Sequence, residues 1–128
     1  MKYSLAALFI AACVALATAA TTYTNKYDKI DLDAVIKNDR LLKSYVKCLL
    51  ETGGCRPDGV ELKSVLPDAL QTDCEKCTEA QKIGSRKMIR HLLKNKREWW
   101  NELEVKYDPK KVYVNKYRDE LLREGIVL

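Results

Sequence analysis

The segment NDRLLKSYVKCLLETGGC, residues 38–55, carries the clearest structural signal in the chain. Asn38-Asp39 is a helix N-cap pair, because these side chains accept hydrogen bonds from the free backbone N–H groups of a first turn. The apolar residues that follow share one helical stripe, with lysines outside it: Leu41, Leu42, Tyr45, Val46, Leu49 and Leu50. Gly53-Gly54 ends the pattern. The segment therefore predicts an amphipathic helix with one buried side.

Helical periodicity continues on both sides of this segment. It predicts a short helix around Leu32–Ile36, and further helices over residues 60–70, 78–95, 98–107 and 112–123. Cys55–Gly59 is expected to form a turn, and Pro67 to kink or divide the helix that contains it. No segment alternates polar and apolar residues for long enough to predict a strand. The fold class is therefore all-α, with about six helices.

The N-terminus has the pattern of a secretory signal peptide. Met1-Lys2 supplies a positive start, residues 5–16 are all apolar, and alanines follow at the positions that signal peptidase prefers. The apolar run is too short to span a bilayer by itself. We expect cleavage of residues 1–20, a secreted extracellular protein, and one domain over residues 21–128 without stable membrane insertion.

Cleavage changes the cysteine count and the charge. Cys13 leaves with the signal peptide, so that four of the five cysteines remain. Lys2 leaves as well, and the remaining 22 basic and 18 acidic side chains give a formal charge of +4. Such a charge favours solubility and indicates no particular partner.

Residues 80–97 contain seven lysines and arginines and no acidic residue. Most of these charges lie opposite the stripe that contains Met88, Ile89, Leu92 and Leu93, so a solvated helix side is the simpler interpretation. Secretion argues against nucleic acid as a partner. A weak attraction to anionic membrane surfaces or anionic ligands stays open.

The remaining cysteines follow the spacing C-x6-C-x18-C-x2-C: Cys48, Cys55, Cys74 and Cys77. Disulfides are expected, because secretion leads to an oxidising compartment and the first pair is spaced more widely than zinc ligands usually are. Four cysteines allow three pairings. Local pairing is the simplest, but loop entropy does not exclude a long-range one. A redox role for the Cys74–Cys77 pair is disfavoured because no strand–helix setting surrounds it.

No enzyme signature is present. His91 is the only histidine and lies in no metal-binding or nucleophile motif. Asp28, Asp31 and Asp33 lack the glycine and terminal glutamate of an EF-hand loop. We expect no catalytic activity, no metal site and no cofactor.

An ordered series of short motifs surrounds the cysteines. It consists of KYD (26–28), DRLL (39–42), YVxCL (45–49), CxPxGxELK (55–63), PDAL (67–70), CEKC (74–77), LxNK (93–96) and KYDP (106–109). With the cysteine spacing, this series closely resembles the insect chemosensory proteins (the OS-D-like family) over residues 23–128. The resemblance implies a compact bundle of about six helices around an apolar channel, with local disulfides Cys48–Cys55 and Cys74–Cys77.

The resemblance also implies reversible binding of long-chain lipophiles such as fatty acids, alcohols, esters and pheromone-like compounds. The ligand-binding residues carried over from the family pattern are Tyr45 and Trp100 at the channel gate or wall, Tyr27 and Asp28 near its mouth, and Leu62 and Ile89 at apolar positions. The chain departs from the pattern at Trp99, beside Trp100, and at Tyr113, where relatives often have tryptophan. Because successive helix residues point about 100° apart, Trp99 and Trp100 must face different surroundings.

Two functions follow from these observations. The first is a monomeric secreted carrier of a hydrophobic small molecule, without nucleic acid or cofactor. The second is a secreted basic helical protein with a filled core that acts through its charged surface. Residue pattern alone favours a filled core, because aromatic residues at helical spacing usually belong to the core.

Overall fold

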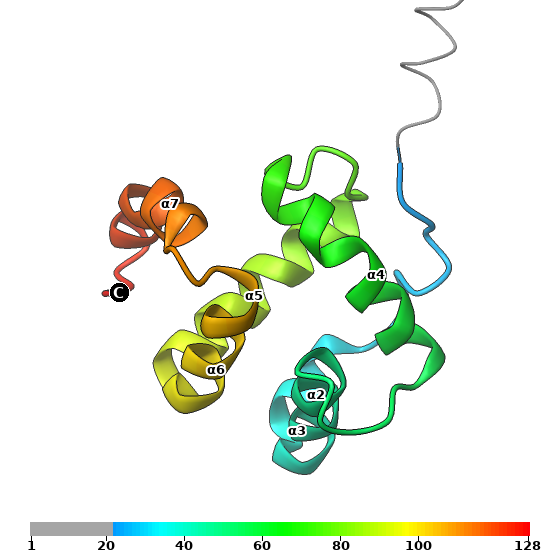
Figure 1. Ribbon diagram of the computed structural model, residues 1–128. Helices are drawn as coiled ribbons and strands as arrows, with labels where there is room; N and C mark the ends of the chain where they lie inside the picture. Colours follow the sequence, from blue (N-terminus) through cyan, green and yellow to red (C-terminus); the bar gives the residue numbers. More distant parts are fainter. Residues whose placement is uncertain (1–21) are drawn as a thin grey trace, which may run out of the picture.

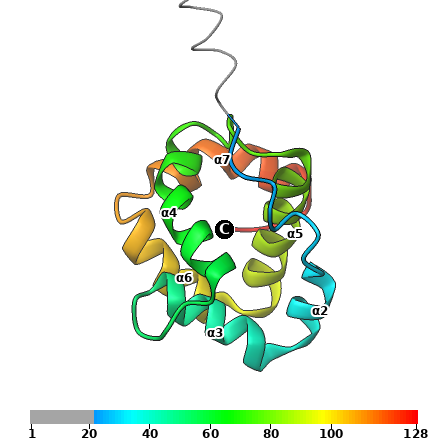
Figure 2. The ribbon, with the colours of Figure 1, turned by 90° about the vertical axis from the view of Figure 1, so that its right-hand side faces the viewer.

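The computed structural model describes residues 22–128, so the signal peptide predicted for residues 1–20 lies outside the described part. Six helices and no strand occur in the described residues (Figure 1): α2 (Leu32–Lys37), α3 (Asp39–Leu49), α4 (Pro57–Gln71), α5 (Glu79–Asn95), α6 (Arg97–Tyr107) and α7 (Val112–Arg123). The all-α prediction with about six helices is confirmed. Seen from the side, the helices are arranged as a ring in which α4 lies across from α5 (Figure 2).

Side-chain caps explain where several helices begin. Asp31 caps α2, Asn38 caps α3, and Thr78 caps α5 with a reciprocal bond to Gln81. Each cap accepts a hydrogen bond from a first-turn N–H group that has no partner within its own helix. The predicted boundary at Asn38-Asp39 is confirmed, since α2 ends and α3 begins there.

Helix α4 differs from its prediction at both prolines. It begins at Pro57, so that Pro57–Gly59 belong to the helix and not to a turn. Proline suits the first helical position, where an N–H group would be unpaired in any case and φ is already helical. Pro67 does not divide the helix, which continues to Gln71. Because Pro67 is exposed, water can reach the backbone carbonyl that loses its N–H partner there.

The buried core lies where α2, α3 and α5 meet. Val35, Leu42 and Leu92 form it, with exposed fractions of 5%, 2% and 6%. Half-buried side chains pack around it: Leu41, Tyr45, Met88, Trp99, Trp100 and Leu103. The close helix pairs are α2–α3, α2–α5, α3–α6 and α5–α6, and α4 joins this group through α3. We refer to Val35, Leu42 and Leu92 as the core cluster.

Two disulfides, Cys48–Cys55 and Cys74–Cys77, close short loops at the two ends of α4. The local pairing implied by the family resemblance is therefore confirmed. Loop entropy gives each of these short bridges about 2 kcal/mol of stabilisation. None of the described helices combines the length and the apolar character needed to cross a membrane.

Candidate functional site

The apolar side chains of α4 remain partly accessible. They are Val60, Leu62, Val65, Leu66, Ala69 and Leu70, and none of them is buried. The one buried residue of α4 is Gly59, which has no side chain. Helix α6 has no buried residue, and α7 has only Val114. Three of the six helices thus keep apolar surface that the fold itself does not cover, and such surface is available to an apolar ligand.

One hollow lies between the end of α4, the end of α6 and the start of α7. It has a volume of about 320 Å³ and is lined by Pro67, Leu70, Gln71, Lys106, Tyr107 and Tyr113. Small-molecule sites occupy about 300–1,000 Å³, so this α4–α6–α7 hollow is of sufficient size. Tyr113, at which the family resemblance predicts a departure from the usual pattern, is one of the residues that line this hollow.

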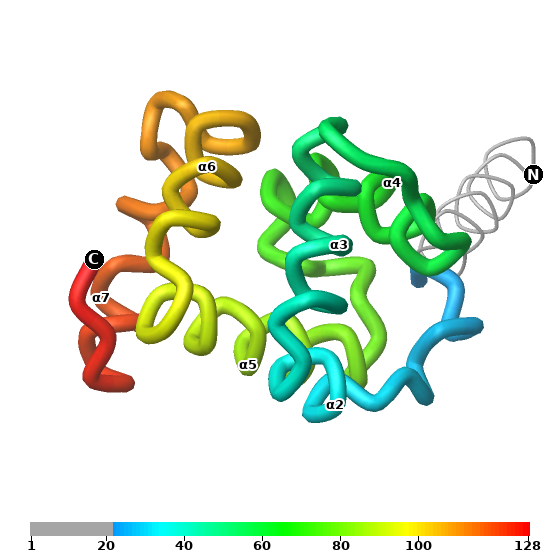
Figure 3. The backbone as a smooth tube through the Cα atoms, turned by 90° about the horizontal axis from the view of Figure 1, so that it is seen from below, coloured from blue at the N-terminus to red at the C-terminus, as the bar shows by residue number. Residues whose placement is uncertain are grey.

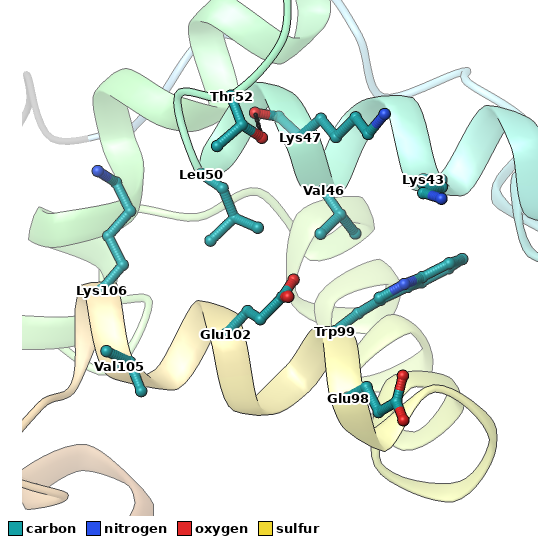
Figure 4. Close-up of a pocket in the computed structure, with 10 residues that line it drawn as sticks. All are labelled: Lys43, Val46, Lys47, Leu50, Thr52, Glu98, Trp99, Glu102, Val105 and Lys106. Carbon is teal, nitrogen blue, oxygen red and sulfur yellow. Dashed lines mark hydrogen bonds between the residues drawn. The ribbon is translucent and has the colours of Figure 1, made fainter.

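A larger hollow is the α3–α6 groove, with a volume of about 700 Å³ (Figure 4). Its lining consists of Lys43, Val46, Lys47, Leu50, Thr52, Glu98, Trp99, Glu102, Val105 and Lys106. In Figure 4, Val46 and Leu50 point from the α3 side toward Glu102 and Trp99 on the α6 side. The groove therefore combines apolar and charged side chains, and the Glu102 carboxylate points into it.

Polar contacts hold the two ends of this groove. At one end, Lys96 Nζ lies 2.7 Å from Asp39 Oδ2. At the other, the Tyr107 hydroxyl donates to the Leu49 carbonyl oxygen at 2.6 Å. Because the first contact joins the starts of α3 and α6 and the second joins their ends, the two helices run in the same direction (Figure 3). Burial, and then the nearby Glu51 carboxylate, raises the pKa of Tyr107.

The structure brings Tyr45 and Trp100 together on the core cluster. The Tyr45 hydroxyl donates to the Asp58 carboxylate in the first turn of α4. Burial, followed by this contact, raises the pKa of Tyr45 to about 12. Trp100 Nε1 donates to Glu104 Oε2 at 2.9 Å. Trp99 lines the α3–α6 groove, so the two indoles do face different surroundings.

The other four predicted binding residues lie on three different elements. Tyr27 and Asp28 are half-buried in the turn before α2, Leu62 is 42% exposed on α4, and Ile89 is half-buried on α5. Oδ1 of Asp28 is buried and has no hydrogen-bond partner in the described part of the chain. None of the six predicted residues lines either hollow. Their role in binding stays a prediction.

Sequence reasoning assigned no binding role to the residues that line the two hollows. Signals existed for several of them, because Lys106 and Tyr107 belong to the KYDP motif and Pro67 and Leu70 to the PDAL motif. Leu50 and Leu70 have the same helical spacing as core residues, and spacing cannot show which leucines border an open space.

Two tyrosine–aspartate hydrogen bonds attach α4 to the rest of the molecule. Besides Tyr45 and Asp58, the Tyr23 hydroxyl donates to the Asp68 carboxylate. Burial and then Asp68 raise the pKa of Tyr23 to about 12. Burial and then the nearby Asp73 raise the pKa of Tyr117 on α7. Hydrogen bonds therefore attach α4 to the rest of the molecule, whereas buried apolar side chains attach α3 and α5.

Comparison with known proteins identifies the family. Residues 23–115 match the model of the insect pheromone-binding family, A10/OS-D. The chain belongs to this family. The description of the family names a binding role and not a catalytic one. In the described residues, no group of three or more histidine, cysteine, aspartate or glutamate side chains is placed to hold a metal ion.

Relatives of this A10/OS-D chain cover nearly its full length. Allergen Tha p 1 of Thaumetopoea pityocampa is 52% identical over 121 residues, which cover 94% of this chain and 95% of the relative. Ejaculatory bulb-specific protein 3 of Drosophila melanogaster is 48% identical over 111 residues, which cover 87% of this chain and 88% of the relative.

Solved structures of chemosensory proteins share the fold of this A10/OS-D chain. A chemosensory protein in complex with bromo-dodecanol is 49% identical with a TM-score of 0.73, over 77% of this chain and 99% of that chain. The antennal chemosensory protein A6 from the moth Mamestra brassicae is 47% identical with a TM-score of 0.67, over 77% and 97% of the two chains. The insect chemosensory family inferred from the sequence motifs is therefore confirmed.

Proposed function

We propose that this chain is a carrier that reversibly binds a lipophilic small molecule among its helices. The observation that carries the proposal is the partly accessible apolar side of α4, whose six apolar residues are all incompletely buried. A ligand with an alkyl chain would complete that burial. The relative whose structure contains bromo-dodecanol, a molecule with a long alkyl chain, supports this class of ligand.

Physical estimates place the affinity in a range suited to a carrier. A twelve-carbon chain gains on the order of 10 kcal/mol at about 0.8 kcal/mol per buried methylene. Loss of free motion costs at least about 4 kcal/mol, which leaves at most about 6 kcal/mol, a Kd of about tens of micromolar or weaker. An apolar site separates neighbouring chain lengths by only about 1–3 kcal/mol per methylene. We therefore expect a broad ligand set of fatty acids, alcohols, esters and pheromone-like compounds.

The predicted binding residues have distinct roles in this proposal. Tyr45 and Trp100 contribute the aromatic wall where the binding space meets the core cluster. Tyr27 and Asp28 form the mouth, where the unpaired Oδ1 of Asp28 can accept a hydrogen bond from a hydroxyl head group. Leu62 and Ile89 supply apolar lining, and Leu62 is 42% exposed without ligand.

The proposal includes the form in which the carrier acts. Residues 1–20 are removed on secretion, and residues 21–128 act outside the cell as a monomer. Binding requires no cofactor and no covalent chemistry, since burial alone supplies the free energy.

A displacement assay with residues 21–128 tests the proposal. The protein is titrated with the apolar fluorescent probe N-phenyl-1-naphthylamine, and alkyl alcohols of increasing length then compete with the probe. We expect stoichiometric uptake, quenching of tryptophan emission, and competition that strengthens with chain length. Tyr45→Ala and Trp100→Ala should each weaken uptake about tenfold, as loss of roughly 1.4 kcal/mol implies. Lys110→Ala, at an exposed lysine outside both hollows, is the control.

The opposite result favours the second function. If alkyl competitors never displace the probe and tryptophan emission stays constant, the helices enclose a filled core. The chain would then act through its charged surface.

A further inference from the structure

The outer side of α5 gathers basic side chains around one exposed apolar residue. Arg86, Lys87, Arg90 and Lys94 are exposed, and Ile83 among them is 63% exposed. With about 100° between successive residues, these five side chains fall within an arc of about 100° on the helix. We call these five residues the α5 basic face.

The opposite side of α5 is occupied by packing. Leu92 is 6% exposed, and Gly84 is buried with Leu32 against it. Leu93 is 3% exposed and lies beside Arg86, at the border of the α5 basic face. The five side chains of the α5 basic face are exposed, and Figure 2 shows α5 on the side of the ring across from α4. Its length from Ile83 to Lys94 is about 16 Å at 1.5 Å per residue, which makes it an extended array of cations and not a point site.

Carboxylates from neighbouring elements reach part of this face. The ion pairs are Lys87 with Asp33 of α2, and Arg90 Nε with Glu124 Oε2 at 2.8 Å. Arg86 and Lys94 have no ion-pair partner in the described part of the chain. Exposed ion pairs contribute little free energy, so a dense anionic surface can compete for Lys87 and Arg90.

We propose that the α5 basic face docks this protein on anionic phospholipid surfaces, with its four cations at the head groups and Ile83 at the head-group boundary. Charge complementarity carries the proposal: an exposed helix side holds four cations around an apolar residue, and clusters of lysine and arginine are attracted to anionic bilayers. Each lysine or arginine near such a surface strengthens binding about fivefold.

Docking would serve a carrier directly. A lipophilic cargo dissolves in membranes, so docking places the carrier where the cargo enters and leaves. This consequence rests on the proposed function, whereas the docking itself does not, because it requires no cargo.

Cosedimentation with vesicles tests the docking. Residues 21–128 are mixed with vesicles of phosphatidylcholine, with and without phosphatidylserine, at low and at physiological ionic strength. We expect binding that requires phosphatidylserine and weakens as salt screens the charges. Arg86→Gln with Lys94→Gln should weaken binding about 25-fold, the product of two fivefold effects. Lys110→Gln with Lys116→Gln, which makes the same change in net charge at exposed lysines outside the face, should weaken it less than fivefold.

A second pair of variants tests the contact with Glu124. Glu124→Gln frees Arg90 and should strengthen vesicle binding severalfold. Glu75→Gln removes the same charge at an exposed position with no ion pair in the described residues, and should change binding less. Circular dichroism and probe uptake check that every variant is folded.

Three results would overturn the docking proposal. They are no binding of the unmodified protein to phosphatidylserine vesicles, equal losses in the two double variants, or binding to heparin without binding to vesicles. Probe uptake that persists in any of these cases shows that the carrier function stands while the docking fails.

Discussion

Two neighbouring helices of the ring, α3 and α4, are stabilised in opposite ways. Helix α3 buries Leu42, Val46 and Cys48, and it belongs to the core cluster. Helix α4 buries only Gly59 and is held by a disulfide before its first turn, by ion pairs and by tyrosine–aspartate contacts. Apolar burial contributes most of the stability of a small domain. Buried apolar side chains therefore contribute more to the free energy of folding around α3 than around α4.

The sharpest test of this comparison is a matched pair of leucine truncations. Leu42→Ala should lower the free energy of unfolding by about 2–5 kcal/mol, because Leu42 is 2% exposed and its removal leaves a cavity. Leu66→Ala on α4 should lower the free energy of unfolding by less than half as much, because Leu66 is only partly buried. Urea unfolding of the disulfide-intact chain measures both. Equal losses would mean that α4 is as firmly packed as α3.

A pair of glycine substitutions tests how closely α4 approaches α3. A Cβ atom at Gly59 would lie 3.0 Å from Cys48 Sγ, whereas one at Gly54 would meet no atom within 4 Å. Overpacking of this kind costs about 1–3 kcal/mol, from which helix propensity recovers up to about 1 kcal/mol. We expect Gly59→Ala to destabilise and Gly54→Ala to be nearly neutral in thermal unfolding. If Gly59→Ala leaves thermal unfolding unchanged, the start of α4 can move away from Cys48 at little cost in free energy.

Alkaline titration tests the polar attachment of α4. Tyr45 has its pKa raised from 10.0 to about 12, so the folded state holds this proton more tightly than the unfolded state does. The resulting stability is fully present below pH 10.0 and is lost as pH rises from there to about 12. Tyr45→Phe should lower the stability at neutral pH by about 1 kcal/mol and flatten its alkaline decline. Denaturation midpoints between neutral and alkaline pH measure both, and an unchanged decline would contradict the role of Tyr45.

The smallest effect on stability is expected at the Lys96–Asp39 contact, where α3 and α6 begin. Lys96 pairs with Asp39 and also lies 5.0 Å from the centre of the Trp99 ring. Lys96→Gln should cost less than about 1 kcal/mol, because exposed ion pairs contribute little. The difference from the unmodified chain should shrink further at high salt. Thermal unfolding at two salt concentrations checks this. If the free energy of unfolding falls by more than about 2 kcal/mol, the contacts of Lys96 contribute as much as buried core residues do.

The sequence predicted the helices well because their signals are local. The bounds Val112–Arg123 of α7 agree with the prediction, and the Asn38 cap lies at the predicted junction. The error at Pro57 has a physical cause: proline and glycine are common in turns, but proline is equally suited to the first turn of a helix. The disulfide pairing needed the family resemblance, since spacing alone left three possibilities.

The residues of the candidate site were harder to predict from the sequence than the helices were. Tyr45 and Trp100, two of the six predicted binding residues, pack against the core cluster, whereas the lining of the two hollows was not foreseen. Leu42 and Leu66 occupy comparable positions in their helical stripes, yet one is buried and the other half-open. That difference depends on which elements meet, and no local pattern records it.

The sequence by itself determined the all-α class, the helix starts other than that of α4, and the family, because caps, periodicity and motif order reside in neighbouring residues. Only the tertiary structure decided which apolar sides are covered. In the tertiary structure, α2, α3 and α5 bury Leu42, whereas α4 is attached by polar contacts. A local sequence pattern does not show this difference, because burial depends on contacts between residues that are distant in the chain.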